Sequence, residues 1–160
     1  RFAGEHKEAM AAFEGALKQS PRNFTAMNHL ALTLIDSTEE KERIRALGYA
    51  HLNAQINSNR NARAGREATV TLAWILFRIG HADVADRVLK GILNAGSISS
   101  EGAYYAALIL ADRGQSKAAQ KILASTLRSK SQFPGRDEAE RILKQLVRVE
   151  QVQTPTKKPK

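Results

Sequence analysis

Residues that could carry acid–base or metal chemistry are few and scattered in this sequence. The four histidines are His6, His29, His51 and His81, and none has a second ligand three or four positions further along one helix. A metal site on a helix needs that spacing, because only residues so spaced share a face. His29 is expected to form hydrogen bonds rather than to catalyse. The chain has no cysteine, which excludes disulfides, thiol nucleophiles and cysteine-bound zinc.

Motifs for nucleophilic or phosphate chemistry are also missing. The ten glycines are isolated, and neither G-x-x-x-x-G-K-[ST] nor G-x-S-x-G occurs. Acidic residues pair with nearby basic ones, as in TEEKER (38–43), which is typical of a solvated helix face. We therefore predict that the chain is not an enzyme, and we expect no catalytic residue, metal, cofactor or small-molecule substrate.

Composition is that of a folded, water-soluble domain with an excess of basic charge. The chain has 160 residues, 42% of them hydrophobic, and a net charge of +9. No apolar run is long enough to cross a bilayer, and the first residues lack a signal-peptide core. Cytoplasmic and periplasmic locations both stay open. Because the chain begins at Arg1 rather than Met, we expect it to be a piece of a longer protein that continues N-terminally with more repeats.

Three stretches share one pattern, which indicates an internal repeat. They are GEHKEAMAAFEGAL (4–17), GHADVADRVLKGIL (80–93) and GQSKAAQKILASTL (114–127). Each opens with Gly, has Ala five residues later, and ends on Leu. The second and third stretches start 34 residues apart. A fixed period of this length is typical of stacked helical units.

An apolar helix precedes two of these stretches, so each unit is predicted to be a helix, a turn with Gly, and a second helix. VTLAWILFRIG (70–80) and YYAALILADRG (104–114) align with each other, and NHLALTLIDS (28–37) joins them. Their apolar residues fall on one helical stripe. The turn glycines are predicted to end helices in the left-handed conformation. Small residues that let two helices approach closely stand at the same step of each segment: Ala31, Ala73 and Ala107.

This pattern resembles the tetratricopeptide repeat (TPR) family, whose unit has 34 residues. The first copy, GEHKEAMAAFEGALKQSPRN, carries the resemblance best, since its residues match the family's turn glycine, small alanines, aromatic residue and closing proline: Gly4, Ala9, Phe13, Ala16 and Pro21. The resemblance implies an all-α fold, a right-handed α-α superhelix. We expect one repeat domain over residues 1–150, made of a partial repeat 1–23, the repeats 24–65, 66–99 and 100–133, and a capping helix 136–150.

Two parts of the chain depart from the repeat. The unit that starts at Phe24 is eight residues too long, which predicts a longer turn in STEEKERI and a protruding loop at 58–65. Asn53 stands where the family has Ala. At the end, FPGRDEAERILKQLVRVE is predicted to form one amphipathic helix that closes the stack, because the last unit needs cover on its outer side. The basic segment 151–160 is predicted to be a disordered tail.

In the TPR family the first helix of each unit lines a concave groove. Carried over, the resemblance places eleven residues in a partner-binding groove: Asn28, His29, Leu32, Asp36, Val70, Trp74, Phe77, Arg78, Tyr104, Tyr105 and Leu108. The Lys and Asn side chains by which some members grasp a terminal carboxylate are not matched. Since aromatic anchors bury much area at low entropy cost, we predict a scaffold that binds a peptide or helical segment of a protein partner.

Two other functions stay open. Basic residues cluster around the irregular unit and on second helices, which would suit an acidic protein surface, a membrane surface or a nucleic acid; they are Lys41, Arg43, Arg45, Arg60, Arg63, Arg66, Lys117, Lys121, Arg128, Lys130 and Arg136. The apolar face of residues 9–17 would lack a partner if the preceding helix is missing, which predicts self-association into a homodimer.

Overall fold

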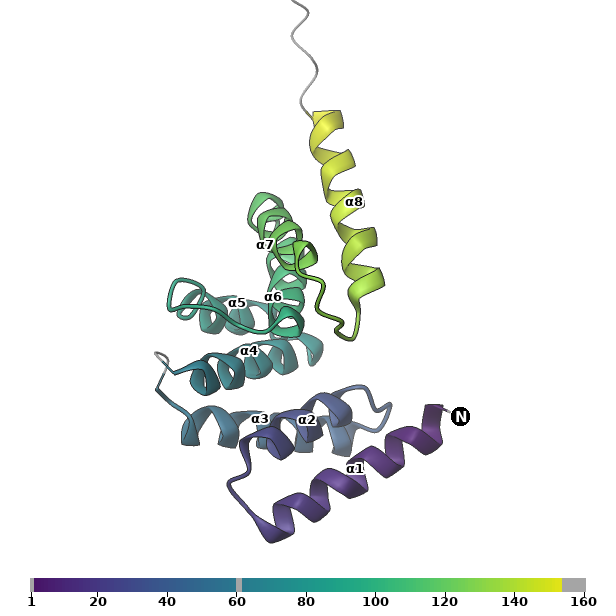
Figure 1. Ribbon diagram of the computed structural model, residues 1–160, viewed down its shortest axis with the longest axis vertical. Helices are drawn as coiled ribbons and strands as arrows, with labels where there is room; N and C mark the ends of the chain where they lie inside the picture. The colour runs from purple at the N-terminus through teal and green to yellow at the C-terminus, as the bar shows by residue number, and fades with distance from the viewer. Residues whose placement is uncertain (1, 60–61, 154–160) are drawn as a thin grey trace, which may run out of the picture. The chain divides into compact units, whose positions relative to one another are not determined.

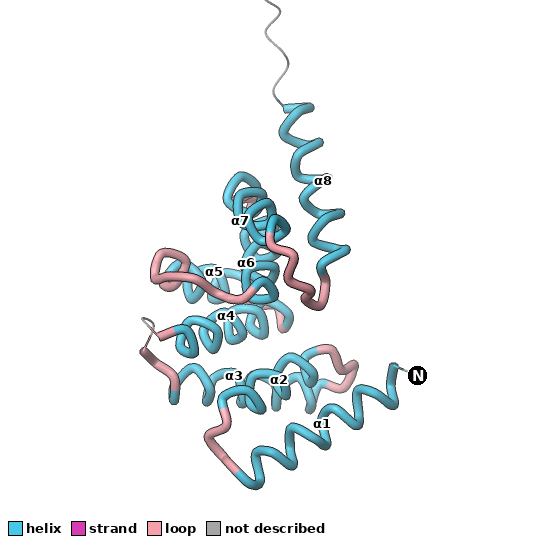
Figure 2. The backbone as a smooth tube through the Cα atoms, in the orientation of Figure 1, coloured by secondary structure: helices cyan, strands magenta, loops and turns pink. Residues whose placement is uncertain are grey.

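The computed structural model describes residues 2–59 and 62–153, and within them all regular structure is helical (Figures 1 and 2). The helices are α1 (Phe2–Gln19), α2 (Phe24–Ile35), α3 (Glu40–Ile56), α4 (Arg63–Arg78), α5 (Ala82–Lys90), α6 (Ser100–Asp112), α7 (Ser116–Arg128) and α8 (Arg136–Gln153). No helix in the described ranges is both long enough and apolar enough to span a membrane.

The chain forms two compact units, Arg1–Ile98 and Ser99–Lys160. In the first unit α1 packs on α2, α2 packs on α3 and on α4, α3 packs on α4, and α4 packs on α5. In the second unit α6 packs on α7, and α7 packs on α8. Each helix therefore lies against the helix that follows it within its unit, as expected for stacked helix pairs.

The core of the first unit is built around small alanines and large aliphatic side chains. Ala31 and Ala73 are fully buried, as are Leu34, Ile75 and Leu89. Small side chains at these positions let the helices approach closely, and the larger side chains fill the space between the helices. The predicted role of the repeated alanines is consistent with this packing.

Caps and glycines set where the helices begin and end. Asn23 caps α2, since its side-chain oxygen accepts a hydrogen bond of 3.0 Å from the backbone N–H of Ala26. Gly80 and Gly114 have φ values of 94° and 73°, so the predicted left-handed turns after α4 and α6 are confirmed. The turn predicted at Gly4 is wrong, because α1 continues through this residue.

The irregular unit differs from its predicted form at one end. The loop expected at 58–65 ends at residue 62, because α4 already begins at Arg63. Gly65 is buried in the first turn of α4, and a Cβ atom there would overlap the backbone carbonyls of Asn57 and Asn59. Only glycine fits this close approach, so the backbone of Asn57 and Asn59 lies directly against the first turn of α4.

In the second unit α8 is the predicted final helix, and it reaches Gln153 rather than residue 150. Residues 154–160 of the predicted tail lie outside the described residues. Ala139 is buried against α7, while Val147 and Val149 are 38% and 51% exposed. The apolar stripe of α8 is therefore buried near its start and exposed toward its end.

Candidate partner-binding surface

Seven of the eleven predicted groove residues lie on α2 and α4, which pack against each other in the first unit, and an eighth, Asp36, is the C-cap of α2. Their exposure divides them into three groups. His29, Asp36 and Arg78 are exposed, Asn28, Leu32 and Phe77 are partly buried, and Val70 and Trp74 are buried at 1% and 8% exposure. We call the first two groups, with Trp74 beneath them, the α2–α4 surface.

An ionic and aromatic cluster occupies the C-terminal end of this surface. Arg78 Nη1 lies 2.9 Å from Asp36 Oδ1, so the ion pair joins the ends of α2 and α4. The Arg78 guanidinium also lies 5.3 Å from the centre of the Trp74 ring, at cation–π distance. Trp74 in turn stacks on Phe77, with 5.7 Å between the ring centres. Arg78 therefore covers the Trp74 ring, and both helices hold it in place.

A second contact fixes the backbone below this cluster. Arg43 on α3 donates a hydrogen bond of 2.6 Å from Nη2 to the backbone carbonyl of Arg78. The carbonyl belongs to the last turn of α4, where no helical N–H is left to bond it. The end of α4 is thus tied to α3 as well as to α2, which makes the cluster a rigid part of the unit.

Near the start of α2 the surface offers a different set of groups. His29 stacks on Phe13 of α1, with 5.5 Å between the ring centres. The side-chain oxygen of Asn28 is buried and accepts no hydrogen bond from the described residues. A buried acceptor without a donor lowers the stability of the folded chain.

The three predicted residues on α6 are placed in the second unit, where the chain itself covers one of them. Tyr104 is 6% exposed and lies 6.1 Å from Phe133 between ring centres. A Cβ atom on Gly135, whose φ is 84°, would lie 2.6 Å from Cε1 of Tyr104. Tyr105 donates a hydrogen bond of 2.8 Å to Glu101, and Leu108 is partly buried.

Phe133 is a neighbour of Tyr104 that sequence reasoning missed. It lies in the segment between α7 and α8, just before the predicted capping helix 136–150, so no helical period pointed to it. The only signal was FPG, in which the glycine supplies the positive φ that turns the chain back toward α6. This segment is held by Arg136, which donates to the carbonyls of Leu127, Ser129 and Ser131.

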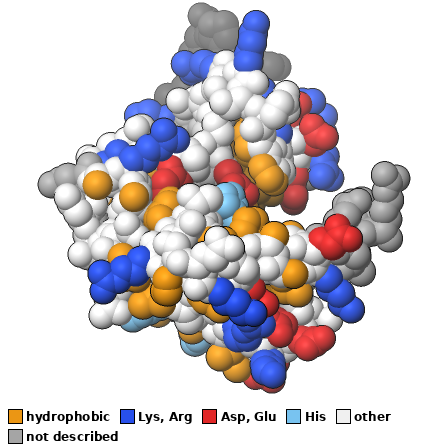
Figure 3. All heavy atoms as spheres, turned by 60° about the horizontal axis from the view of Figure 1, so that its bottom comes forward, with side chains coloured by type: hydrophobic (Ala, Val, Ile, Leu, Met, Phe, Trp, Pro, Cys, Tyr) orange, Lys and Arg blue, Asp and Glu red, His pale blue; other side chains and the backbone are white. Residues whose placement is uncertain are grey.

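Several of the basic residues predicted to form an outer binding surface are engaged within the chain. Arg45 forms ion pairs with Glu14 and Glu42, and the hydrogen bond to the Glu14 carboxylate raises the pKa of the Arg45 guanidinium. Arg66 is buried and donates a hydrogen bond of 2.8 Å to the carbonyl of Ser97. On the face shown in Figure 3, basic and acidic side chains alternate with hydrophobic ones. Arg60 lies outside the described residues.

The apolar face expected on residues 9–17 lies partly against α2. Met10, Phe13 and Leu17 are partly buried, since α1 packs on α2. The large hydrophobic side chains exposed in the described part of the first unit lie instead on α3, at Ile44, Leu52 and Ile56. No group of three His, Cys, Asp or Glu residues that could hold a metal ion occurs among the described residues.

The helix pairs and their left-handed glycine turns define an all-α, TPR-like α-α superhelix fold closed by a C-terminal helix. The chain is similar to the crystal structure of MamA protein, with a TM-score of 0.52 and 18% sequence identity. The alignment covers 100% of this chain and 92% of MamA, so this helical-repeat likeness extends over the whole sequence. At this identity the likeness shows the fold alone. No family model matches the chain, and no curated protein matches it either.

Proposed function

We propose that this chain is a protein-interaction scaffold that binds a peptide or helical segment of a partner on the α2–α4 surface. The observation that supports this most is the Asp36–Arg78 pair above Trp74 and Phe77. It places aromatic area, a cation and an anion at one end of a surface built on two rigid helices. Interfaces gain most of their affinity from such clustered aromatic and arginine anchors.

The chemistry of the surface indicates what the partner segment should carry. Leu32 and Phe77 are partly exposed and would contact apolar side chains of the segment. An acidic side chain near one end could compete with Asp36 for Arg78. We therefore expect an apolar segment with a carboxylate at one end.

Tyr105 and Leu108 of the second unit belong to the same proposal as a smaller, separate contact. Their side chains are partly exposed, whereas Tyr104 is covered by Phe133 and Gly135. Tyr104 would then support its neighbours rather than contact the partner. The polyanion alternative is not favoured, because Arg43, Arg45, Arg66 and Arg136 already bond to groups of this chain.

A selection from a library of displayed peptides tests the proposal, with tryptophan fluorescence as the readout. Trp74 is the only tryptophan, and it lies beneath the proposed contact. Selected peptides should change its fluorescence on titration, and Leu32→Asp should weaken binding by at least about tenfold. Arg87→Glu is the matched control, since Arg87 is exposed on α5. Peptides that bind Leu32→Asp as well as the native chain would reject the α2–α4 surface.

A further inference from the structure

One face of α3 carries a line of exposed apolar side chains. Ile44, Leu52 and Ile56 are 63%, 43% and 37% exposed, and Gly48 lies between the first two. These four residues are spaced four apart, which forms a ridge of the kind through which helices pack. We call this line the α3 ridge. Scattered apolar residues on a surface need no explanation, but an ordered row along one helix marks an interaction site.

The α3 ridge is separate from the face of α3 that packs inside the unit. The opposite face of α3 packs on α2 and α4 through Ala46, Ala50 and Asn53, all of which are buried. α3 therefore has apolar residues on two faces, and only one of them is used inside the unit. The second face is available to another molecule.

The sequence of the ridge is complementary to itself. If two α3 helices cross antiparallel at Gly48, Ile44 of each lies opposite Leu52 of the other. Gly48 has open space around its Cβ position, with no atom within 4 Å, so two helices can approach closely at this point. A two-fold contact of this kind uses the same patch on both copies, as most homodimers do.

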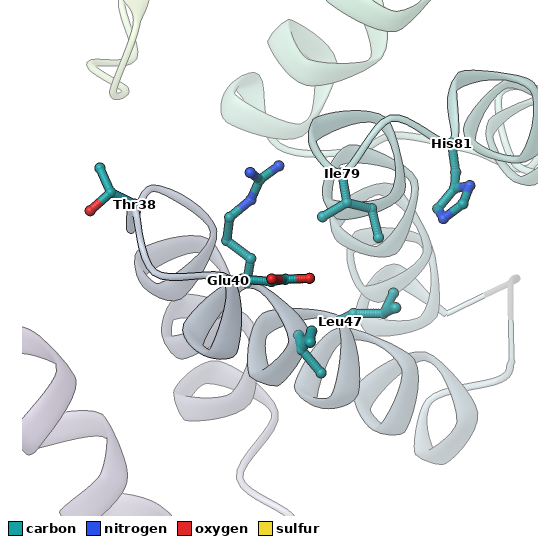
Figure 4. Close-up of a pocket in the computed structure, with 7 residues that line it drawn as sticks. Thr38, Glu40, Leu47, Ile79 and His81 are labelled. Carbon is teal, nitrogen blue, oxygen red and sulfur yellow. The ribbon is translucent and has the colours of Figure 1, made fainter.

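A depression beside the ridge would receive a side chain from the second copy. It has a volume of about 380 Å³, and Ile44, Leu47 and Ile79 give it apolar walls. Glu40 and His81 stand at its edge (Figure 4). Leu52 of the second copy lies opposite Ile44 in the antiparallel arrangement, so its side chain would enter this depression. The same insertion would occur twice, once on each copy.

Charges at the two ends of α3 favour the same arrangement. Glu39 and Glu40 are exposed at the N-terminal end of α3. Arg63, whose side chain is 72% exposed, begins α4 just after the C-terminal end of α3. Antiparallel crossing brings the acidic end of each copy toward Arg63 of the other. Opposite charges at the edge of an apolar contact fix its register and direction.

We propose that two copies of this chain associate through the α3 ridge, antiparallel and with Gly48 at the two-fold axis. The contact lies on a different helix face from the α2–α4 surface, and it does not depend on the function proposed above. It also differs from the self-association expected at residues 9–17, where α1 is already packed on α2.

The lack of native cysteine makes cross-linking a direct test. Gly48→Cys places a thiol at the proposed axis and fits the monomer, because the space around Gly48 is open. Mild oxidation should convert this variant to a disulfide-linked dimer much faster than Ser125→Cys, an exposed position on α7. Equal rates for the two variants would overturn the proposal.

Sedimentation of the full chain gives an independent measurement. The native mass should rise from one chain to two with concentration, and Leu52→Glu should weaken dimerisation by at least about tenfold. Val147→Glu on α8 is the control, because Val147 has a similar exposure of 38%. Glu40→Arg should weaken the dimer, and Arg63→Glu in the same chain should restore it. A native mass of one chain at all concentrations, or a dimer insensitive to Leu52→Glu with unchanged helicity, would overturn the proposal.

Discussion

Asp36 and Arg78 join the C-terminal ends of two neighbouring first helices, α2 and α4, through an ion pair of 2.9 Å. The two residues are 42 positions apart in the chain. Arg78 also covers Trp74, so this single side chain connects charge pairing with aromatic packing. The pair is the clearest case in which residues predicted for one surface are brought into direct contact.

Removing the pair should expose the tryptophan without unfolding the unit. In Arg78→Ala the ring of Trp74 loses its cover, so its fluorescence should be quenched more strongly by iodide. The loss of stability should be at most about 1 kcal/mol, because exposed ion pairs contribute little. Asp36→Asn is the comparison, since it breaks the ion pair but leaves Arg78 over the ring. Equal quenching of Arg78→Ala and the native chain would contradict this prediction.

Replacing Gly15 in α1 and Gly65 in α4 by Ala should change the stability of the protein in opposite directions. Gly65→Ala forces a methyl group into the carbonyls of Asn57 and Asn59, and should destabilise the protein by at least about 2 kcal/mol. Gly15 lies in α1 with no atom within 4 Å of its Cβ position, so Gly15→Ala should stabilise by up to about 1 kcal/mol. Urea unfolding of both variants measures the difference. Destabilisation of similar size in both would show that the packing around Gly65 is not as described.

Asn53 should contribute to stability although the repeat pattern that the sequence resembles has Ala at its position. Its side chain is fully buried and accepts a hydrogen bond of 2.9 Å from Asn57, while its own amide lies 3.4 Å from the carbonyl of Phe24. Asn53→Ala removes both side-chain hydrogen bonds, although the Asn57 amide keeps its bond of 3.0 Å to the backbone carbonyl of residue 53. The loss should cost about 1–3 kcal/mol. Thermal unfolding tests this. A variant as stable as the native chain would mean that alanine suits the site equally well.

Arg136 should hold the segment between α7 and α8. It donates to three backbone carbonyls, including that of Leu127 in the last turn of α7. Arg136→Ala should therefore destabilise the second unit by about 1.5–3 kcal/mol, because bonds to charged donors are stronger than neutral ones. Amide exchange should rise in α7 and α8 but stay unchanged in α2. Unchanged amide exchange in α7 and α8 would contradict this role of Arg136.

The sequence predicted the helix pairs because their apolar residues, alanines and turn glycines repeat with one period. It did not predict where α4 begins, since the close approach of Gly65 to Asn57 and Asn59 is a tertiary contact with no local signal. For the candidate site, position within the repeat selected Asp36, Trp74 and Arg78, which lie near each other in the structure. It could not show that Phe133 covers Tyr104, because an irregular segment follows no helical period.

The exposed row on α3 escaped prediction for a related reason. Repeat reasoning assigns each helix one buried face, and α3 has apolar residues on two. The repeat pattern therefore assigned no role to Ile44 and Leu52, which lie away from the buried face of Ala46 and Ala50.

The division of the chain into Arg1–Ile98 and Ser99–Lys160 has a consequence for its cooperativity. Helical-repeat chains are held by contacts between neighbours, so one part can melt while another stays folded. Trp74 reports on the first unit alone, whereas circular dichroism averages over both. Midpoints that disagree between these two probes would indicate sequential rather than all-or-none melting, in which case a single free energy of unfolding would not describe this chain.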